Sequence, residues 1–70
     1  MERKRVSASN IRSIGYDARN QVLEVELRSG TIVQFSGVSE TVYRGFMNAP
    51  SPDSYYRDRI EDDYPSKRLR

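Results

Sequence analysis

The chain has 70 residues, 36% hydrophobic and 31% charged, which indicates one small domain with little apolar surface to bury. It has no cysteine and no histidine, which excludes a disulfide framework, a zinc–thiolate site, a thiol nucleophile and the commonest general base. The formal charge is +2, but residues 1–5 and 67–70 together carry six bases and one acid, so the middle of the chain is net acidic.

The two ends of the chain differ in composition from the rest. Residues 1–5 read as a basic leader and residues 66–70 as a basic tail, and both are predicted to be flexible. The leader is not followed by an apolar run, so it does not resemble a signal peptide, and no segment has the length of a membrane span. We therefore expect residues 6–65 to form the domain of a cytoplasmic protein.

Strand patterns come first in the chain. Residues 9–16 suggest a strand with Ile14 and Tyr16 on one face, and residues 17–20 supply Asx side chains that favour a turn. Residues 22–28 then alternate between apolar and polar types, which points the apolar side chains inward and two glutamates toward solvent.

The next reversal, at residues 28–30, sets the register of a hairpin with residues 31–36. A two-residue turn would pair Val25 with Gln34, whereas a three-residue loop with Gly30 in the left-handed region places Val25 opposite Val33. The second register keeps apolar residues on one face and is preferred. It leaves Val22 and Ile32 on the opposite face, as a possible apolar patch for a second copy of the chain.

Two short helices follow the strands. Ser39 is a good N-cap for a helix that runs to about Ala49, and Ser51 caps a second one with Pro52 in its first turn. In the second helix the apolar stripe consists of Tyr56, Ile60 and Tyr64. The predicted fold is α+β: a three-stranded antiparallel β-meander covered on one face by two short C-terminal helices.

The ordered spacing of these residues resembles the KTSC domain family, from about residue 6 to residue 65. The resemblance rests on these features: Ser9, Ile11, the block Ile14-Gly15-Tyr16-Asp17, Leu23, Val25, Leu27, Ser29-Gly30, Val38, Val42-Tyr43, Phe46, Ala49, Ser51, Tyr55-Tyr56, Ile60 and Tyr64-Pro65. The family is named for its occurrence at the C-terminus of some lysyl-tRNA synthetases, and it also exists as a free-standing small protein of bacteria and phages. The resemblance implies the fold and a suspected link to RNA.

The chain departs from the family pattern at several positions. It has Val33-Gln34-Phe35 where a Tyr-x-Tyr pair is usual, Ser39 for a Pro, Asp53 for a Gly, Arg57 for an Asn and Glu61 for an Arg. These changes affect any family ligand contact that uses those positions.

Catalysis and metal binding are poorly supported by the residues. The acidic cluster Asp58, Glu61, Asp62 and Asp63 lacks the spacing of a calcium loop and is typical of a solvated helix face. No nucleotide-binding glycine motif is present. We therefore expect no enzymatic activity, no cofactor and no metal.

Binding of a phosphorylated nucleotide-type ligand has more support. Tyrosines alternate with arginines at residues 43–44 and 55–59, a combination that stacks a base and holds a phosphate. The free amides after Ser51 add phosphate donors. The candidate ligand-binding residues are Tyr43, Arg44, Ser51, Tyr55, Arg57 and Arg59. Tyr56 and Tyr64 share the apolar stripe and are assigned to the core.

Two functional hypotheses remain open at the level of sequence. The first is a non-catalytic module, as a homo-oligomer, for RNA or for a small nucleotide signal that it sequesters. The second is a protein–protein interaction module, an adaptor or a phage-type inhibitor of a host protein. Strong salt dependence would favour the first hypothesis, because phosphate contacts are electrostatic.

Overall fold

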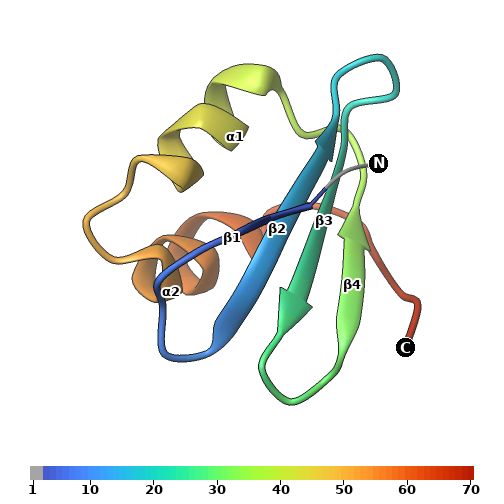
Figure 1. Cartoon of the computed structure of the whole chain (residues 1–70). Coiled ribbons are helices and arrows are strands. Elements are labelled where there is room, and N and C mark those ends of the chain that lie inside the picture. Colours follow the sequence, from blue (N-terminus) through green and yellow to red (C-terminus); the bar gives the residue numbers. More distant parts are fainter. Residues whose placement is uncertain (1–2) are drawn as a thin grey trace.

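Five strands form one antiparallel sheet in the computed structural model, which describes residues 3–70 (Figure 1). The strands are β1 (Arg3–Arg5), β2 (Ile11–Asp17), β3 (Val22–Leu27), β4 (Ile32–Phe35) and β5 (Ser66–Arg68), and they lie in this order across the sheet. Helix α1 (Glu40–Met47), helix α2 (Pro52–Tyr55) and a π-helical turn (Tyr56–Ile60) lie between β4 and β5 in the chain. The α+β class is confirmed.

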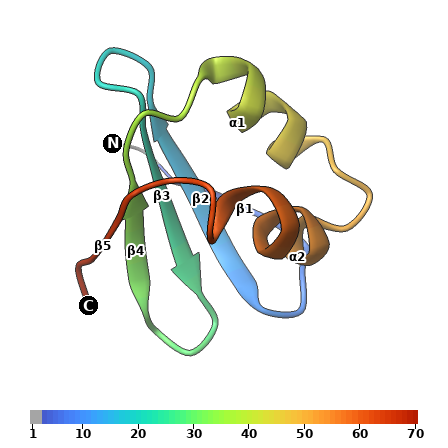
Figure 2. The same ribbon diagram turned by 180° about the vertical axis from the view of Figure 1, so that it is seen from behind.

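The prediction of a three-stranded sheet was wrong, because the sheet has two further strands, one at each edge. β1 pairs with β2, and β5 pairs with β4, so segments assigned to a flexible leader and tail extend the sheet on both sides (Figure 2). Both strands have three exposed residues, Arg-Lys-Arg and Ser-Lys-Arg, with no apolar alternation. Backbone pairing with the neighbouring strands therefore forms β1 and β5, and no hydrophobic pattern in the sequence predicts them. Residues 1 and 2 of the leader lie outside the described residues.

The predicted hairpin register is confirmed. Val25 pairs with Val33 and Leu23 with Phe35, while Gly30 adopts a φ of 99°. The Gly30 amide donates to the Leu27 carbonyl at 3.0 Å, which closes the loop. This register puts the apolar residues of both strands on the face that the helices cover.

The core lies between one face of the sheet and the helical segments, which sit together on the same side of the sheet (Figure 1). Its buried members come from all three central strands and from the helical region: Ile11, Ile14, Leu23, Val25, Phe35, Val38, Phe46, Tyr56 and Ile60. The Phe35 and Tyr56 rings meet edge to face, with centroids 5.8 Å apart. This packing fixes the helical segments on the sheet.

Both predicted helix caps are present. The Ser39 Oγ accepts a hydrogen bond from the Val42 amide at 3.3 Å, and the Ser51 Oγ accepts one from the Ser54 amide at 3.4 Å. The helix ends differ from the prediction: α1 stops at Met47 and the π-helical turn stops at Ile60. Tyr64 lies beyond the last turn and is half-buried against the core.

The face of the sheet away from the helices is not the solvated face with an apolar patch that the sequence predicted. Ile32 is only 7% exposed and Val22 is half-buried. The Glu24 and Glu26 side chains are 14% and 16% exposed, because polar neighbours cover them. Arg3 lies 3.1 Å from Glu24, and these two residues link the edge strand β1 to β3.

Candidate functional site

A pocket of about 330 Å³ lies where the α1–α2 connection meets the helical segments. Its lining residues come from the connection, from α2 and from the π-helical turn: Ala49, Pro50, Ser51, Ser54, Tyr55, Asp58 and Arg59. Three of the six predicted site residues, Ser51, Tyr55 and Arg59, therefore share one pocket. We call it the Tyr55 pocket.

Two serine hydroxyls lie in the Tyr55 pocket. The Ser51 Oγ donates to the Ser54 Oγ at 3.1 Å while it accepts from the Ser54 amide as the helix cap. Ser54 was not predicted, although its spacing of three residues from the cap could have indicated it. A hydroxyl can donate or accept, so this pair can turn toward an anionic ligand.

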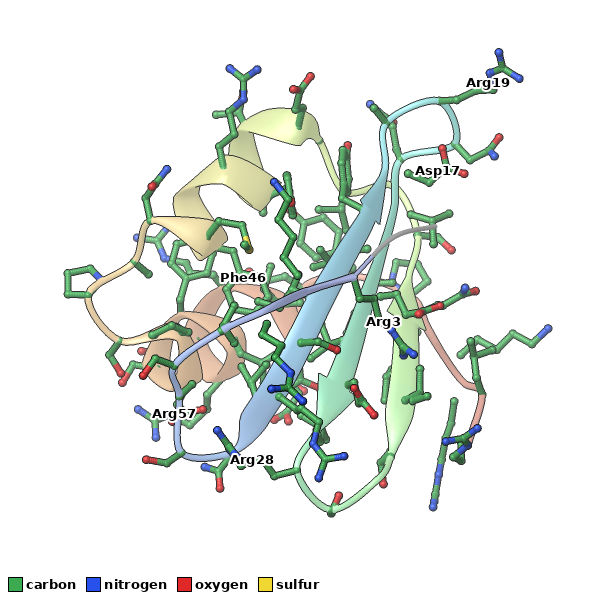
Figure 3. The ribbon with its side chains drawn as sticks, viewed as in Figure 1. Arg3, Asp17, Arg19, Arg28, Phe46 and Arg57 are labelled. Carbon is green, nitrogen blue, oxygen red and sulfur yellow. The ribbon has the colours of Figure 1, made fainter. Side chains whose placement is uncertain are left out.

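The Tyr55 ring is held firmly on one side. It stacks on Phe46 with centroids 5.5 Å apart and an interplanar angle of 11°, and its hydroxyl donates to the Val42 carbonyl at 3.4 Å. Phe46 points from α1 into the space between the helices and the sheet (Figure 3). The stack presents Tyr55 to the pocket in a fixed orientation.

The charged groups of the Tyr55 pocket are Arg59 and Asp58, both on the π-helical turn. Within residues 3–70 the Arg59 side chain forms no ion pair, whereas the Asp58 carboxylate accepts from the Arg57 Nε at 3.3 Å. Arg59 is exposed, so its guanidinium can move toward a ligand. Single π-helical turns are frequent at functional sites, because they re-aim side chains on a helix.

The remaining three predicted residues lie elsewhere. Tyr43 stacks on Tyr16 with centroids 4.7 Å apart, and Arg44 forms an exposed ion pair with Glu40 at 2.8 Å. Burial, with smaller contributions from Glu40 and Asp17, raises the pKa of the Tyr16 phenol above 10.0. Its hydroxyl donates to the Val38 carbonyl at 2.6 Å. The Tyr43 stack is therefore part of the attachment of α1 to the sheet.

Arg57 lies on a different side of the helical turn from the Tyr55 pocket. It lines a second pocket, of about 260 Å³, together with Asn10, Ile11, Leu27, Asp53, Tyr56 and Glu61. Burial raises the pKa of the Tyr56 phenol above 10.0, and the Glu61 carboxylate adds to the rise. The prediction that Arg57 and Arg59 act at one site is not supported by their positions.

Within the described part of the chain, no three His, Cys, Asp or Glu side chains gather where they could hold a metal ion. Among the same residues, none of the helices is both long and apolar enough to cross a bilayer.

Comparison with known proteins places the chain in a family. The model of the KTSC domain matches residues 7–64. The chain belongs to the KTSC domain family. A protein of Stutzerimonas stutzeri, described as uncharacterized, is 37% identical over 51 residues, which cover 73% of this chain and 72% of that protein.

The fold of this KTSC domain matches a solved relative over almost its whole length. The crystal structure of the KTSC domain protein YPO2434 from Yersinia pestis superposes with a TM-score of 0.95 at 33% identity. The match covers 99% of this chain and 97% of the Yersinia protein. The two edge strands thus fall within the length that the match covers.

Proposed function

We propose that this KTSC domain is a non-catalytic binding module that takes up a phosphorylated nucleotide-type ligand, RNA or a small nucleotide, in the Tyr55 pocket. The observation that carries the proposal is the convergence of an aromatic ring, two hydroxyls and an arginine without an ion-pair partner among residues 3–70. These groups supply stacking, hydrogen bonding and charge, which a nucleotide needs together.

The two ends of a nucleotide fit different parts of the pocket. Ala49, Pro50 and Tyr55 offer apolar and aromatic surface for a base, while Arg59 and the two serines offer donors for a phosphate. Asp58 carries a negative charge, so a phosphate is expected on the Arg59 side. The Asp58 carboxylate can accept from ribose hydroxyls or from N–H groups of the base.

The volume of the pocket sets the size of the ligand. About 330 Å³ lies at the lower end of the range for small-molecule sites, so the pocket holds one nucleotide unit. An RNA strand would place a single nucleotide there and run across the surface on either side. A small nucleotide would occupy the pocket with one side open to solvent, and binding would sequester it by lowering its free concentration.

The absence of catalysis is part of the same proposal. The chain has no histidine or cysteine to act as a base or nucleophile near neutral pH. Burial raises the pKa of the Tyr16 and Tyr56 phenols above 10.0, which disfavours the phenolate form that a base would need. We expect the bound ligand to be released unchanged.

A homo-oligomer in the cytoplasm and a protein-binding adaptor remain proposals with less support. The homo-oligomer was expected to use an apolar patch at Val22 and Ile32, and Ile32 is buried. Among the described residues, Leu69 is the one large apolar side chain that is well exposed, at 46%. The Tyr55 pocket therefore carries the stronger hypothesis.

The test compares two arginine variants in a nucleotide-binding titration at fixed salt. Arg59→Ala should weaken the affinity for the responding nucleotide at least about tenfold, because a charge-assisted phosphate contact is lost. Arg19→Ala is the matched control, since Arg19 is exposed on the β2–β3 turn (Figure 3) and does not line the Tyr55 pocket. Equal affinities of the two variants would exclude the Tyr55 pocket as the site.

A further inference from the structure

Three arginines line a separate pocket of about 290 Å³ at the sheet. Arg5 comes from β1, Arg12 from β2 and Arg28 directly follows β3, and Val6 completes the lining. No carboxylate is among these lining residues. Because the three arginines are far apart in sequence, only the pairing of β1 with β2 and of β2 with β3 brings them together. We call this the triple-arginine pocket.

The backbone around the triple-arginine pocket positions its side chains. The register of β2 against β3 shifts between Ile11 and Ser13, so Arg12 occupies a β-bulge with no partner on β3. The Val6 amide donates to the Arg12 carbonyl at 3.1 Å, and this bond continues the β1–β2 pairing. A bulge re-aims the side chain that it carries, and here that side chain lines the pocket.

Arg28 is fixed by two contacts with the β1–β2 loop. Its amide donates to the Asn10 carbonyl and its Nε donates to the Ala8 carbonyl, both at 2.9 Å. The two terminal nitrogens of Arg28 take part in no hydrogen bond within residues 3–70. A guanidinium held by its Nε alone keeps donors for a ligand in a defined orientation.

The charges of the triple-arginine pocket are poorly balanced by the protein itself. Within the described residues, the one carboxylate within ion-pair distance of these arginines is Glu26, 3.9 Å from Arg12. The Ser13 hydroxyl already donates to that carboxylate at 2.8 Å. Arg5 forms no ion pair in the described part of the chain. Three arginines thus line one pocket. Their one nearby counter-charge among residues 3–70 is the Glu26 carboxylate, which lies outside the lining and already accepts a hydrogen bond from Ser13.

We propose that the triple-arginine pocket binds a phosphate dianion, either free or as the terminal phosphate of a nucleotide. Three arginines that line one pocket can offer planar guanidinium forks to the oxygens of a phosphate, which is how arginine clusters recognise such groups. The bound anion also relieves the repulsion among the three cations. The proposal does not depend on the Tyr55 pocket, with which this pocket shares no lining residue.

The experiment measures thermal unfolding of the full chain at constant ionic strength, with chloride replaced by inorganic phosphate, a nucleoside 5′-monophosphate or the uncharged nucleoside. Both phosphates should raise the midpoint, and the nucleoside should not. A larger effect of the nucleotide that Arg5→Ala removes would assign the phosphate of this pocket to a nucleotide, and an effect of inorganic phosphate alone would assign it to the free anion. Equal midpoints in phosphate and chloride would overturn the proposal.

Variants locate the effect of inorganic phosphate. Arg5→Ala should weaken phosphate binding at least about tenfold, and Arg5→Lys, which keeps the charge but loses the planar fork, should give an intermediate loss. Arg28 is not a suitable target, because it also holds the loop through Ala8. Arg19→Ala, which changes a residue outside both pockets, should leave the phosphate effect unchanged. A loss of phosphate binding in Arg5→Ala no larger than that in Arg19→Ala would contradict the proposal.

Discussion

Gly45 is the position in helix α1 where a side chain would meet Tyr55. A Cβ at residue 45 would lie 2.8 Å from the Tyr55 Oη and 3.4 Å from its Cζ. Glycine inside a helix costs about 1 kcal/mol relative to alanine, so its presence here needs a reason. Close packing of α1 against the Tyr55 ring of α2 supplies it.

The contact between residue 45 and Tyr55 can be measured with a double-mutant cycle. Gly45→Ala should stabilise the Tyr55→Phe variant by about 1 kcal/mol, because removal of the hydroxyl leaves only ordinary contacts and the helix propensity is gained. When Tyr55 is kept, Gly45→Ala should stabilise the protein less or should destabilise it. The reason is that the Tyr55 hydroxyl must move away from the new methyl group. Urea unfolding of the unmodified protein, the two single variants and the double variant measures the change in unfolding free energy in each background. Equal effects in the two backgrounds would show that Tyr55 moves freely.

Glu26 predicts a pH dependence of stability. The hydrogen bond from Ser13, and then the charges of Arg3, Arg12 and Arg70, lower its pKa below the ordinary value of 4.5. A lowered folded-state pKa stabilises the fold at pH values above 4.5, and this contribution disappears as the pH falls through the lower folded-state value.

Glu26→Gln should therefore be less stable than the unmodified protein at pH 7. The difference should shrink as the pH is lowered below 4.5, where the glutamate becomes neutral like the glutamine. Urea unfolding midpoints at pH 7 and at acidic pH values measure it. A difference that stays constant over this range would mean that the charge of Glu26 contributes nothing.

At the scale of elements, Asp53 joins helix α2 to the loop between β1 and β2. Its carboxylate accepts from the Ser9 amide at 2.9 Å and from the Asn10 amide at 3.1 Å, across more than 40 residues of sequence. Asp53 thus connects the helical layer to the sheet. The same loop carries Ala8, which orients Arg28.

Asp53→Ala should cost about 1 to 2 kcal/mol of stability, because two backbone amides lose a charged acceptor. Amide hydrogen exchange should become faster at Ser9 and Asn10 in particular. Asp62→Ala is the control, as Asp62 is exposed and follows the π-helical turn. Unchanged exchange at both amides would show that the loop is held by other contacts.

The elements that the sequence predicted correctly are those with a hydrophobic or capping signal. Leu23 and Val25 determined the hairpin register, and Ser39 and Ser51 determined where the helices start. β1 and β5 carry neither signal, because charged residues at a sheet edge are compatible with a strand and with a solvated tail alike. The π-helical turn depends on tertiary packing of Tyr56 and Ile60, which local propensity does not encode.

The sequence predicted the part of the candidate site that lies on one face of one helical segment. Ser51, Tyr55 and Arg59 follow one another at intervals of four residues, which places them on the same side of consecutive turns. Tyr43 and Arg44 belong to another helix, and only the tertiary fold shows that Tyr43 stacks on Tyr16 instead. The triple-arginine pocket had no local signal, because it depends on β1, which the sequence did not reveal.

At the scale of the whole molecule, both edge strands of the sheet are basic. β1 contributes Arg3, Lys4 and Arg5 on one side, and β5 contributes Lys67 and Arg68 on the other, whereas β3 between them carries two glutamates. Charged edge strands oppose pairing with another sheet and also attract anions. This arrangement places basic surface at both edges of the sheet of a chain whose middle is net acidic.

The most direct test of nucleotide binding in the Tyr55 pocket is nuclear magnetic resonance of the isotope-labelled protein during titration with nucleoside 5′-monophosphates and a short single-stranded RNA. We predict that backbone amide signals of Ser51, Ser54, Tyr55 and Arg59 shift on binding, and that Arg59→Ala removes these shifts while Arg19→Ala retains them. Shifts at Arg5, Arg12 and Arg28 would report on the triple-arginine pocket separately. If no ligand moved the signals of the Tyr55 pocket, the proposal of a nucleotide-binding module at this site would be wrong.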